Sequence, residues 1–304
     1  MRIGAIDLGT NSCRMLLADY SQGKVKEVKK ELRIVRLGEG VDRNRHLSTE
    51  AAERALQVIL EFVEEMKAHS VEAITIIGTS ALRDVNNAFL LAERIREKTG
   101  LELNIISGAE EARLNYLGAG LEGDGNLVLD IGGGSTEFIW QDEGGKLNYR
   151  SLDMGAVRMT ERHIRDVEKE ISAEELQLIE EDVRRTMEGK LKDIPVNIHR
   201  AVGLGGTITT LAAIDQGLEE YDSARIHGYL LHRKQIEGIL QRLAELNLQE
   251  RRKIRGLEPG RADIITAGTK ILATIMDILV IESVRASEQD LLYGAIIKLA
   301  ESLV

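Results

Sequence analysis

The stretch that decides the fold is Asp7-Leu8-Gly9-Thr10-Asn11-Ser12, which recurs as Asp130-Ile131-Gly132-Gly133-Gly134-Ser135. Each copy follows an apolar strand pattern, precedes a second one and leads into a hairpin. A further pair of loops, Gly78-Thr79 and Gly206-Thr207, follows later strand patterns in the same order. Loops repeated in matching order and context indicate an internal duplication rather than a chance likeness of glycine turns. The sequence therefore predicts an α/β protein of two similar halves.

An aspartate at the end of a strand, followed by a tight glycine turn, is typical of a ligand site. It places a carboxylate at the carboxyl edge of the sheet, where open α/β sheets bind their ligands. Glycine permits the turn and a close backbone approach, so that successive N–H groups and nearby hydroxyls suit phosphate oxygens. We predict phosphate-binding positions at Gly9, Thr10, Asn11, Ser12, Gly132, Gly133, Gly134, Ser135, Thr136, Gly206 and Thr207.

Carboxylates cannot bind phosphate directly, and the acids of this pattern suit a divalent cation instead. Asp7, Asp130 and Glu137 are predicted to hold Mg²⁺ through oxygen or water ligands. Two such loops facing each other across a cleft would hold a chain of phosphates from both sides.

The length of the chain fits a division into two domains. It has 304 residues, 43% of them hydrophobic, and each half carries apolar periodic segments long enough to bury a core. We place the first domain at residues 1–120 and the second at 121–287. A last helix, 288–303, begins after Ser287 as its cap and is expected to pack back on the first domain.

Charge and composition limit the partners. A net charge of −10 argues against general nucleic-acid binding, which needs a basic face, but it leaves room for a polyanion in a locally basic cleft. The longest apolar run, 264–281, contains Lys270 and Asp277, so a buried core helix is predicted rather than a membrane span. Cys13 is the only cysteine, which excludes an intrachain disulfide, and Met1 leads straight into a strand pattern rather than a signal peptide. These features predict a cytoplasmic protein.

Other hydrolase motifs are missing from the sequence. Asp19 stands where the arginine of a Cys-x₅-Arg motif beginning at Cys13 would be. Glu137 stands where a Gly-x-Ser-x-Gly motif around Ser135 would need its last glycine. There is also no His-Glu-x-x-His helix and no Gly-x₄-Gly-Lys-[Ser/Thr] phosphate loop.

Four further segments extend the pattern of the paired loops. They are Gly78-Thr79-Ser80-Ala81-Leu82-Arg83, Ser107-Gly108-Ala109-Glu110-Glu111-Ala112-Arg113-Leu114, Met154-Gly155-Ala156-Val157-Arg158 and Gly205-Gly206-Thr207. In this combination the chain resembles the exopolyphosphatase / guanosine pentaphosphate phosphohydrolase (Ppx/GppA) family, from Ala5 to about Gly294.

The resemblance implies a fold, an activity and particular residues. The fold is that of the actin / sugar kinase / heat-shock chaperone ATPase superfamily, two ribonuclease H-like domains with a cleft between them. The activity is Mg²⁺-assisted attack of water on the terminal phosphate of polyphosphate or of guanosine pentaphosphate, a nucleotide of the stringent response. The catalytic glutamate of the family falls on Glu111, its acidic metal or water-organising positions on Asp130 and Glu137, and a motif arginine on Arg83. A homodimer is likewise only what the resemblance suggests.

Two features depart from the family. Longer relatives carry a C-terminal extension with a His-Asp helical domain, and this chain has no His-Asp dipeptide. Ser287-Glu288-Gln289-Asp290 replaces the more usual glycine-containing pattern, so the substrate contacts of that pattern are not carried over to these residues.

Several alternatives remain open from the sequence. A helix-start glutamate can serve only to favour the helix dipole, a reading that fits Glu110 better than Glu111, and spacing alone does not separate the two. The paired loops would look alike in a small-molecule kinase of the same superfamily or in a non-hydrolytic sensor of guanosine tetra- or pentaphosphate. The preferred phosphoanhydride, short polyphosphate, long polyphosphate or guanosine pentaphosphate, is not decided by the residues.

Overall fold

The chain forms two compact units. A computed structural model describes residues 1–121, 126–142, 144–190, 194, 198 and 200–303. Unit 1 consists of Met1–Gly120 together with Gln289–Val304, and unit 2 of Leu121–Glu288. Each unit combines one sheet with helices, so the predicted α/β class is confirmed.

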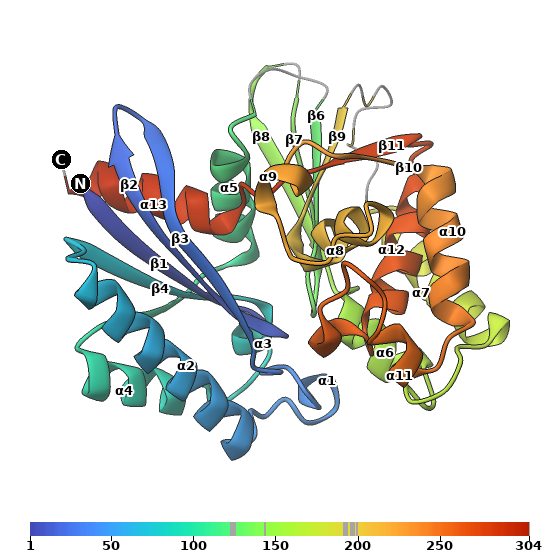
Figure 1. Ribbon diagram of the computed structural model, residues 1–304, viewed down its shortest axis with the longest axis horizontal. Coiled ribbons are helices and arrows are strands. Elements are labelled where there is room, and N and C mark those ends of the chain that lie inside the picture. Colours follow the sequence, from blue (N-terminus) through green and yellow to red (C-terminus); the bar gives the residue numbers. More distant parts are fainter. Residues whose placement is uncertain (122–125, 143, 191–193, 195–197, 199, 304) are drawn as a thin grey trace. The chain divides into compact units, whose positions relative to one another are not determined.

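Unit 1 is a five-stranded sheet with helices on both faces (Figure 1). Its strand order is β3-β2-β1-β4-β5, with β2 antiparallel to both neighbours and β4 and β5 parallel to β1. The elements are β1 (Arg2–Leu8), β2 (Ser12–Ser21), β3 (Lys24–Ile34), α1 (Val41–Asn44), α2 (Thr49–Ala68), β4 (Ala73–Gly78), α3 (Ser80–Arg83), α4 (Ala88–Thr99), β5 (Leu103–Ile105), α5 (Gly108–Ala119) and α13 (Leu291–Ser302).

The alternation of side chains along β1 explains why unit 1 needs helices on both faces. Ile6 and Leu8 pack with α2 and α4, whereas Ile3 and Ala5 pack with α13 and Leu114 of α5. Because both faces are buried, the strand is apolar almost throughout. Cys13, at the start of β2, is fully buried in the α2 face, and this burial raises the pKa of its thiol.

Unit 2 is a six-stranded sheet of order β10-β11-β9-β6-β7-β8 (Figure 1). Its elements are β6 (Asn126–Ile131), β7 (Thr136–Gln141), β8 (Leu147–Leu152), α6 (Ala156–His163), α7 (Ala173–Met187), β9 (Arg200–Leu204), α8 (Gly205–Asp215), α9 (Ser223–Ile226), β10 (Leu230–His232), α10 (Arg233–Ala244), α11 (Leu248–Arg251), a 3₁₀ turn (Pro259–Arg261), α12 (Ile265–Ile278) and β11 (Ser283–Ala286). Its core joins the strands β6 and β7 to helices α7, α8, α10 and α12.

The two sheets repeat one topology. The order β8-β7-β6-β9-β11 in unit 2 matches β3-β2-β1-β4-β5 in unit 1, and β10 is an added edge strand. In the predicted repeat, the match between the loops after β4 and β9 is shifted by one residue. Leu8 pairs with Gly78 across β1 and β4, whereas Asp130 pairs with Leu204 across β6 and β9. The residue that stands in the place of Gly78 is therefore Gly205 and not Gly206.

The last helix begins later than its sequence predicts. The amide of Ser287 donates to the carbonyl of Gly203 at 2.9 Å, which continues the pairing of β11 with β9. That hydrogen bond keeps residue 287 in the sheet of unit 2, so Ser287 is not a helix cap. The N-cap is Asp290, whose carboxylate accepts from the amide of Leu292 at 3.1 Å. The helix α13 then packs on the sheet of unit 1.

The apolar run 264–281 forms α12, a core helix of unit 2. Its two charged residues reach partners at the surface, Lys270 to Glu180 and Asp277 to Arg184 and Arg233. Within the described residues, no helix is both long enough and apolar enough to cross a bilayer.

Candidate active site

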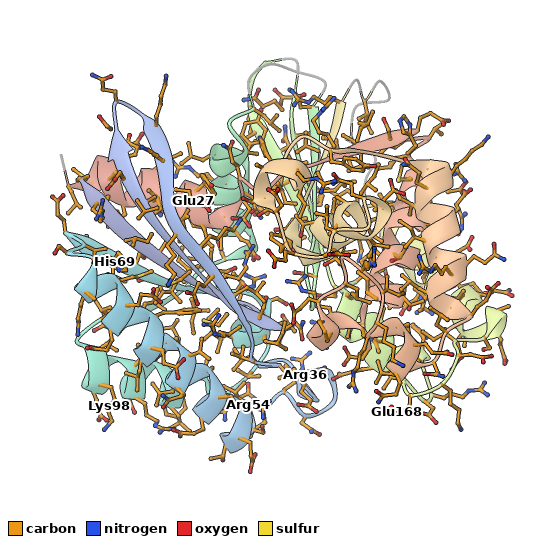
Figure 2. The ribbon with its side chains drawn as sticks, viewed as in Figure 1. Glu27, Arg36, Arg54, His69, Lys98 and Glu168 are labelled. Carbon is orange, nitrogen blue, oxygen red and sulfur yellow. The ribbon has the colours of Figure 1, made fainter. Side chains whose placement is uncertain are left out.

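The loop between β1 and β2 is a closed turn supported by the chain that follows β3. The amide of Gly9 donates to the carbonyl of Ser12 at 3.0 Å, and the Asn11 carbonyl accepts from the amides of residues 35 and 36, each at 2.9 Å. Arg54 of α2 holds this supporting turn by donating to the carbonyls of residues 35 and 36 (Figure 2). Thr10 is buried beneath the turn, so the backbone of the predicted phosphate loop is fixed before any ligand arrives.

Asp7, at the end of β1, is held by an arginine. It faces Arg14 across the β1–β2 pair, and Arg14 Nε donates to Asp7 Oδ2 at 2.9 Å. A second guanidinium nitrogen of Arg14 contacts Asp290 at the start of α13. The other oxygen, Asp7 Oδ1, is buried and has no hydrogen-bond partner among the residues that the structure describes. Burial raises the pKa of the Asp7 carboxyl, and Asp290 adds to the rise although Arg14 opposes it.

Arg83 and Glu111 form a direct ion pair. Arg83 Nη1, at the end of α3, donates to Glu111 Oε2 at 2.6 Å and to the carbonyl of Ile106 at 3.0 Å. Glu111 is only 8% exposed, whereas the adjacent Glu110 turns to Lys298 of α13. The structure therefore separates the two glutamates that spacing alone could not: Glu110 makes a surface ion pair, and Glu111 lies with Arg83. Both Arg83 and Glu111 follow strands that run parallel to β1, so they share the sheet edge of Asp7.

The loop between β6 and β7 has the same construction. The amide of Gly132 donates to the carbonyl of Ser135 at 3.0 Å, as Gly9 does to Ser12 in unit 1. The Gly133 carbonyl accepts from the first amides of α6, and Arg158 Nε donates to the Gly134 carbonyl at 2.7 Å. A Cβ on Gly155 would lie 2.3 Å from the backbone of Gly133, so only glycine fits behind this loop.

Two carboxylates meet on adjacent strands beside this loop. Asp130 and Glu137 are direct cross-strand partners of β6 and β7, so their side chains lie on one face of the sheet. Glu137 is buried, and its Oε1 accepts from the Ser151 hydroxyl at 2.7 Å. Thr136, predicted as a phosphate ligand, is fully buried, and its hydroxyl donates to the Met154 carbonyl at 2.5 Å.

The first turn of α8 faces the same edge. A Cβ on Gly205, whose φ is +79°, would lie 2.3 Å from Asp130 Oδ1, so the carboxylate rests directly against the helix start. The same construction on Gly206 would place a Cβ 1.4 Å from Arg261 Nη1. Thr207 is buried in this turn. The N-cap residue of α8 is Leu204, whose side chain makes no capping hydrogen bond, and the start of the helix carries the positive end of its dipole.

The predicted residues thus gather at the carboxyl edge of each sheet, unit by unit. In unit 1 these are the 9–12 loop, Asp7, Arg83 and Glu111; in unit 2 they are the 132–136 loop, Asp130, Glu137 and the Gly206-Thr207 turn. In the described part of the chain, no three His, Cys, Asp or Glu side chains gather closely enough to enclose a metal ion. The acidic pair Asp130 and Glu137 nevertheless fits Mg²⁺, which proteins commonly hold by one or two carboxylates together with phosphate oxygens and water.

Comparison with known proteins decides the family. The profile of the Ppx/GppA phosphatase family matches residues 16–303. The chain belongs to the Ppx/GppA phosphatase family. This Ppx/GppA protein is 34% identical over 317 residues to exopolyphosphatase 2 of Mycobacterium tuberculosis, with 98% of each chain covered. The resemblance inferred from the paired loops is confirmed.

Two further relatives place the chain within the family. It is 35% identical over 287 residues to a guanosine-5′-triphosphate,3′-diphosphate pyrophosphatase of Vibrio atlanticus, covering 92% of this chain and 55% of that one. The crystal structure of the Ppx/GppA family member from Aquifex aeolicus is 30% identical, covers 100% of this chain and 98% of that one, and gives a TM-score of 0.81. The fold class predicted from sequence is therefore that of solved Ppx/GppA proteins.

Sequence reasoning assigned no role to two residues of this candidate Ppx/GppA site. Arg261 lies against Gly206, and Asp290 joins Arg14 and Asp7. The Pro-Gly-Arg turn at 259–261 is a weak signal for the first, because proline is rare in this chain. Only the tertiary fold reveals the second, since Asp290 and Arg14 lie at opposite ends of the sequence.

Proposed function

We propose that the protein hydrolyses phosphoanhydrides, releasing the terminal phosphate of inorganic polyphosphate or of guanosine pentaphosphate. The observation that carries this proposal is the ion pair between Glu111 and Arg83 at the sheet edge of unit 1. A buried carboxylate held by a guanidinium suits the handling of a water molecule near phosphate. The printed names of the two relatives, an exopolyphosphatase and a guanosine-5′-triphosphate,3′-diphosphate pyrophosphatase, support the same two substrates.

The glycine loops are proposed to bind the phosphate groups. Backbone amides of residues 10–11 and 133–134 present N–H groups to an anion, and the first turn of α8 adds the positive end of its helix dipole. The carbonyls of these loops are already engaged with neighbouring amides. Such preformed donors lose little freedom on binding, which favours a charged substrate without a basic protein surface.

In unit 2, Mg²⁺ would be held by Asp130 and Glu137. In unit 1, Asp7 is a separate candidate ligand, because its Oδ1 has no hydrogen-bond partner among the described residues. When bound there, the ion would neutralise charge on the phosphate oxygens.

The hydrolytic step follows from these groups. Glu111 orients a water molecule and accepts its proton while the water oxygen bonds to the terminal phosphorus. The bond from that phosphorus to the bridging oxygen breaks, and the shortened chain leaves as an anion. Arg83 fixes the Glu111 carboxylate through Nη1, and its charge offsets the negative charge of the phosphates. If guanosine pentaphosphate is the substrate, the reaction belongs to the stringent response. A homodimer and a cytoplasmic location stay predictions from sequence.

Phosphate release from three substrates tests the function. Short polyphosphate, long polyphosphate and guanosine pentaphosphate are each incubated with the protein, with Mg²⁺ and again with a chelator. We expect Mg²⁺-dependent release from at least one. Tight binding of guanosine pentaphosphate without release would favour a sensor, and ATP-dependent phosphorylation of a small acceptor would favour a kinase.

The glutamate pair offers a matched test of the mechanism. Glu111→Gln should lower kcat by roughly 10²- to 10⁴-fold, the range that general-base assistance supplies. Glu110→Gln, one residue away on the same helix, should leave kcat close to normal because Glu110 contacts Lys298 at the surface. Near-normal turnover by Glu111→Gln would remove its proposed role.

A further inference from the structure

The chain returns from unit 2 to unit 1 at a point next to the candidate site. Unit 2 ends at Glu288 and unit 1 resumes at Gln289, immediately before the N-cap of α13. That N-cap, Asp290, is 4% exposed and uses both carboxylate oxygens. Its Oδ1 accepts from the amide of Leu292 at 3.1 Å, and its Oδ2 pairs with Arg14.

Arg14 carries the connection onward to the phosphate loop. The same guanidinium that meets Asp290 donates from Nε to Asp7 Oδ2 at 2.9 Å. A guanidinium is planar, with donors in a fixed fork, so its orientation toward one carboxylate sets its orientation toward the other. Asp290 therefore fixes the direction from which Arg14 approaches Asp7.

The start of α13 is also locked against the helix that carries Glu111. A Cβ on Gly118 of α5 would lie 1.9 Å from the Asp290 carbonyl oxygen, and one on Gly294 would lie 2.0 Å from the Leu114 carbonyl oxygen. Only glycine permits this approach of α5 and α13. The first turn of α13 thus touches both the Asp7 side and the Glu111 helix of the unit 1 site.

Unit 2 has a carboxylate at the position that Arg14 occupies in unit 1. Glu137 stands on β7 where Arg14 stands on β2, as the cross-strand partner of the loop aspartate. Its carboxylate accepts from Ser151 on the neighbouring strand β8. Asp290 and its link through Arg14 belong to unit 1, so the unit 2 loop serves as an internal control.

We propose that Asp290 is a positioning residue, which acts through Arg14 to hold Asp7 and the 9–12 loop in the geometry that phosphate hydrolysis requires. The proposal rests on the proposed function for its effect on turnover. Its structural part, the restraint of the 9–12 loop by Asp290, does not depend on the identity of the substrate.

The test uses Asp290→Asn in the full-length protein. Asparagine caps a helix as well as aspartate does, so α13 keeps its start while Arg14 loses a charged partner. We expect kcat for phosphate release to fall about tenfold, as for other residues that orient a directly acting group, with little change in KM. Serine at position 290 can also cap the helix but is too short to reach Arg14, so kcat of Asp290→Ser should fall by the same factor. Asp222→Asn, a cap substitution in unit 2, should keep normal turnover.

Hydrogen exchange gives a readout that needs no activity. In Asp290→Asn, amides of the peptide 7–14 should exchange faster, whereas those of 130–137 should be unchanged. Unaltered exchange in 7–14, or turnover per folded molecule equal to that of the parent protein, would overturn the proposal. If the parent protein releases no phosphate, the proposed function fails, while faster exchange confined to 7–14 would still support the restraint.

Discussion

The role proposed for Glu111 depends on how Arg83 is packed. One of its nitrogens, Nη1, donates both to Glu111 and to the backbone of Ile106. The backbone contact fixes the guanidinium, and the guanidinium fixes the carboxylate. Because the Glu111 side chain is largely buried, removal of this partner leaves a carboxylate with poor solvation and no set orientation.

Replacement of Arg83 tests this dependence. Arg83→Met should lower kcat by about 10²-fold, because the proposed base loses the contact that orients it. Arg83→Lys should recover part of the lost kcat, since the lysine ammonium restores the positive charge but not the planar, forked donors of the guanidinium. Steady-state phosphate release measures both. Arg94→Ala, which breaks a surface pair with Glu53, serves as the control. Equal kcat in Arg83→Met and the parent protein would contradict the assigned role.

At this scale the sequence predicts the polar positions but not their partners. Asp7 and Asp130 stand at strand ends, Glu111 lies in the first turn of α5 and Arg83 ends the short helix after β4, so local pattern locates all four. Neither spacing nor helix propensity shows which glutamate turns inward at 110–111. That choice depends on where α13 places Lys298, a long-range result of packing on unit 1.

At the scale of the elements, the end of α12 is unusual because a valine occupies a left-handed backbone position. The amide of Ile281 donates to Met276 at 2.8 Å and that of Val280 to Asp277 at 3.4 Å, the two hydrogen bonds of a Schellman motif. Val280 therefore occupies the left-handed position, with φ +53° and 78% exposure. At the end of α4, Gly100 takes the same conformation with φ +75°.

A pair of reciprocal substitutions tests these helix ends. Val280→Gly should raise the free energy of unfolding by about 0.5–1 kcal/mol, because relief of the left-handed strain exceeds the entropy cost of glycine. Gly100→Val should lower it by roughly 1–2 kcal/mol, although its Cβ would meet no atom. Urea unfolding measures both. A loss of stability in Val280→Gly would show that the side chain contributes more than its exposure indicates.

Helix starts show when local signals suffice. Ser172 and Glu175 form a capping box at the start of α7, and both hydrogen bonds of the box join residues three positions apart. The same logic fails at Ser287, because its amide is taken by Gly203 of the sheet. A cap can be predicted from sequence unless a strand pairing competes for the same backbone group.

At the scale of the whole molecule, both ends of the chain contribute to the core of unit 1. Ile3 and Ala5 near the N-terminus and Leu292 and Ile296 near the C-terminus lie in one buried cluster. Unit 1 therefore cannot complete its core until the segment after unit 2 has been made. The duplicated loops predict two similar halves, but contacts between the chain ends are set by the fold and not by any repeated motif.

Truncation of one core side chain should show this dependence. Ile296→Ala should cost about 2–5 kcal/mol of unfolding free energy, since a fully buried isoleucine leaves a cavity. Leu303→Ala, an exposed change on the same terminal segment, should alter stability by less than about 0.5 kcal/mol. Urea unfolding compares the two. Similar small losses in both variants would mean that α13 contributes little to the core.

The burial of Cys13 has a practical consequence for spectroscopy. The only thiol of the chain is sealed in the core and resists ionisation, so it should not react with maleimide dyes in the native protein. Cysteines introduced at exposed Lys98 (Figure 2) and Lys253 would then be the sole labelling positions, one in each unit. Energy transfer between such dyes could follow the separation of the units as polyphosphate is added, with the native cysteine left in place.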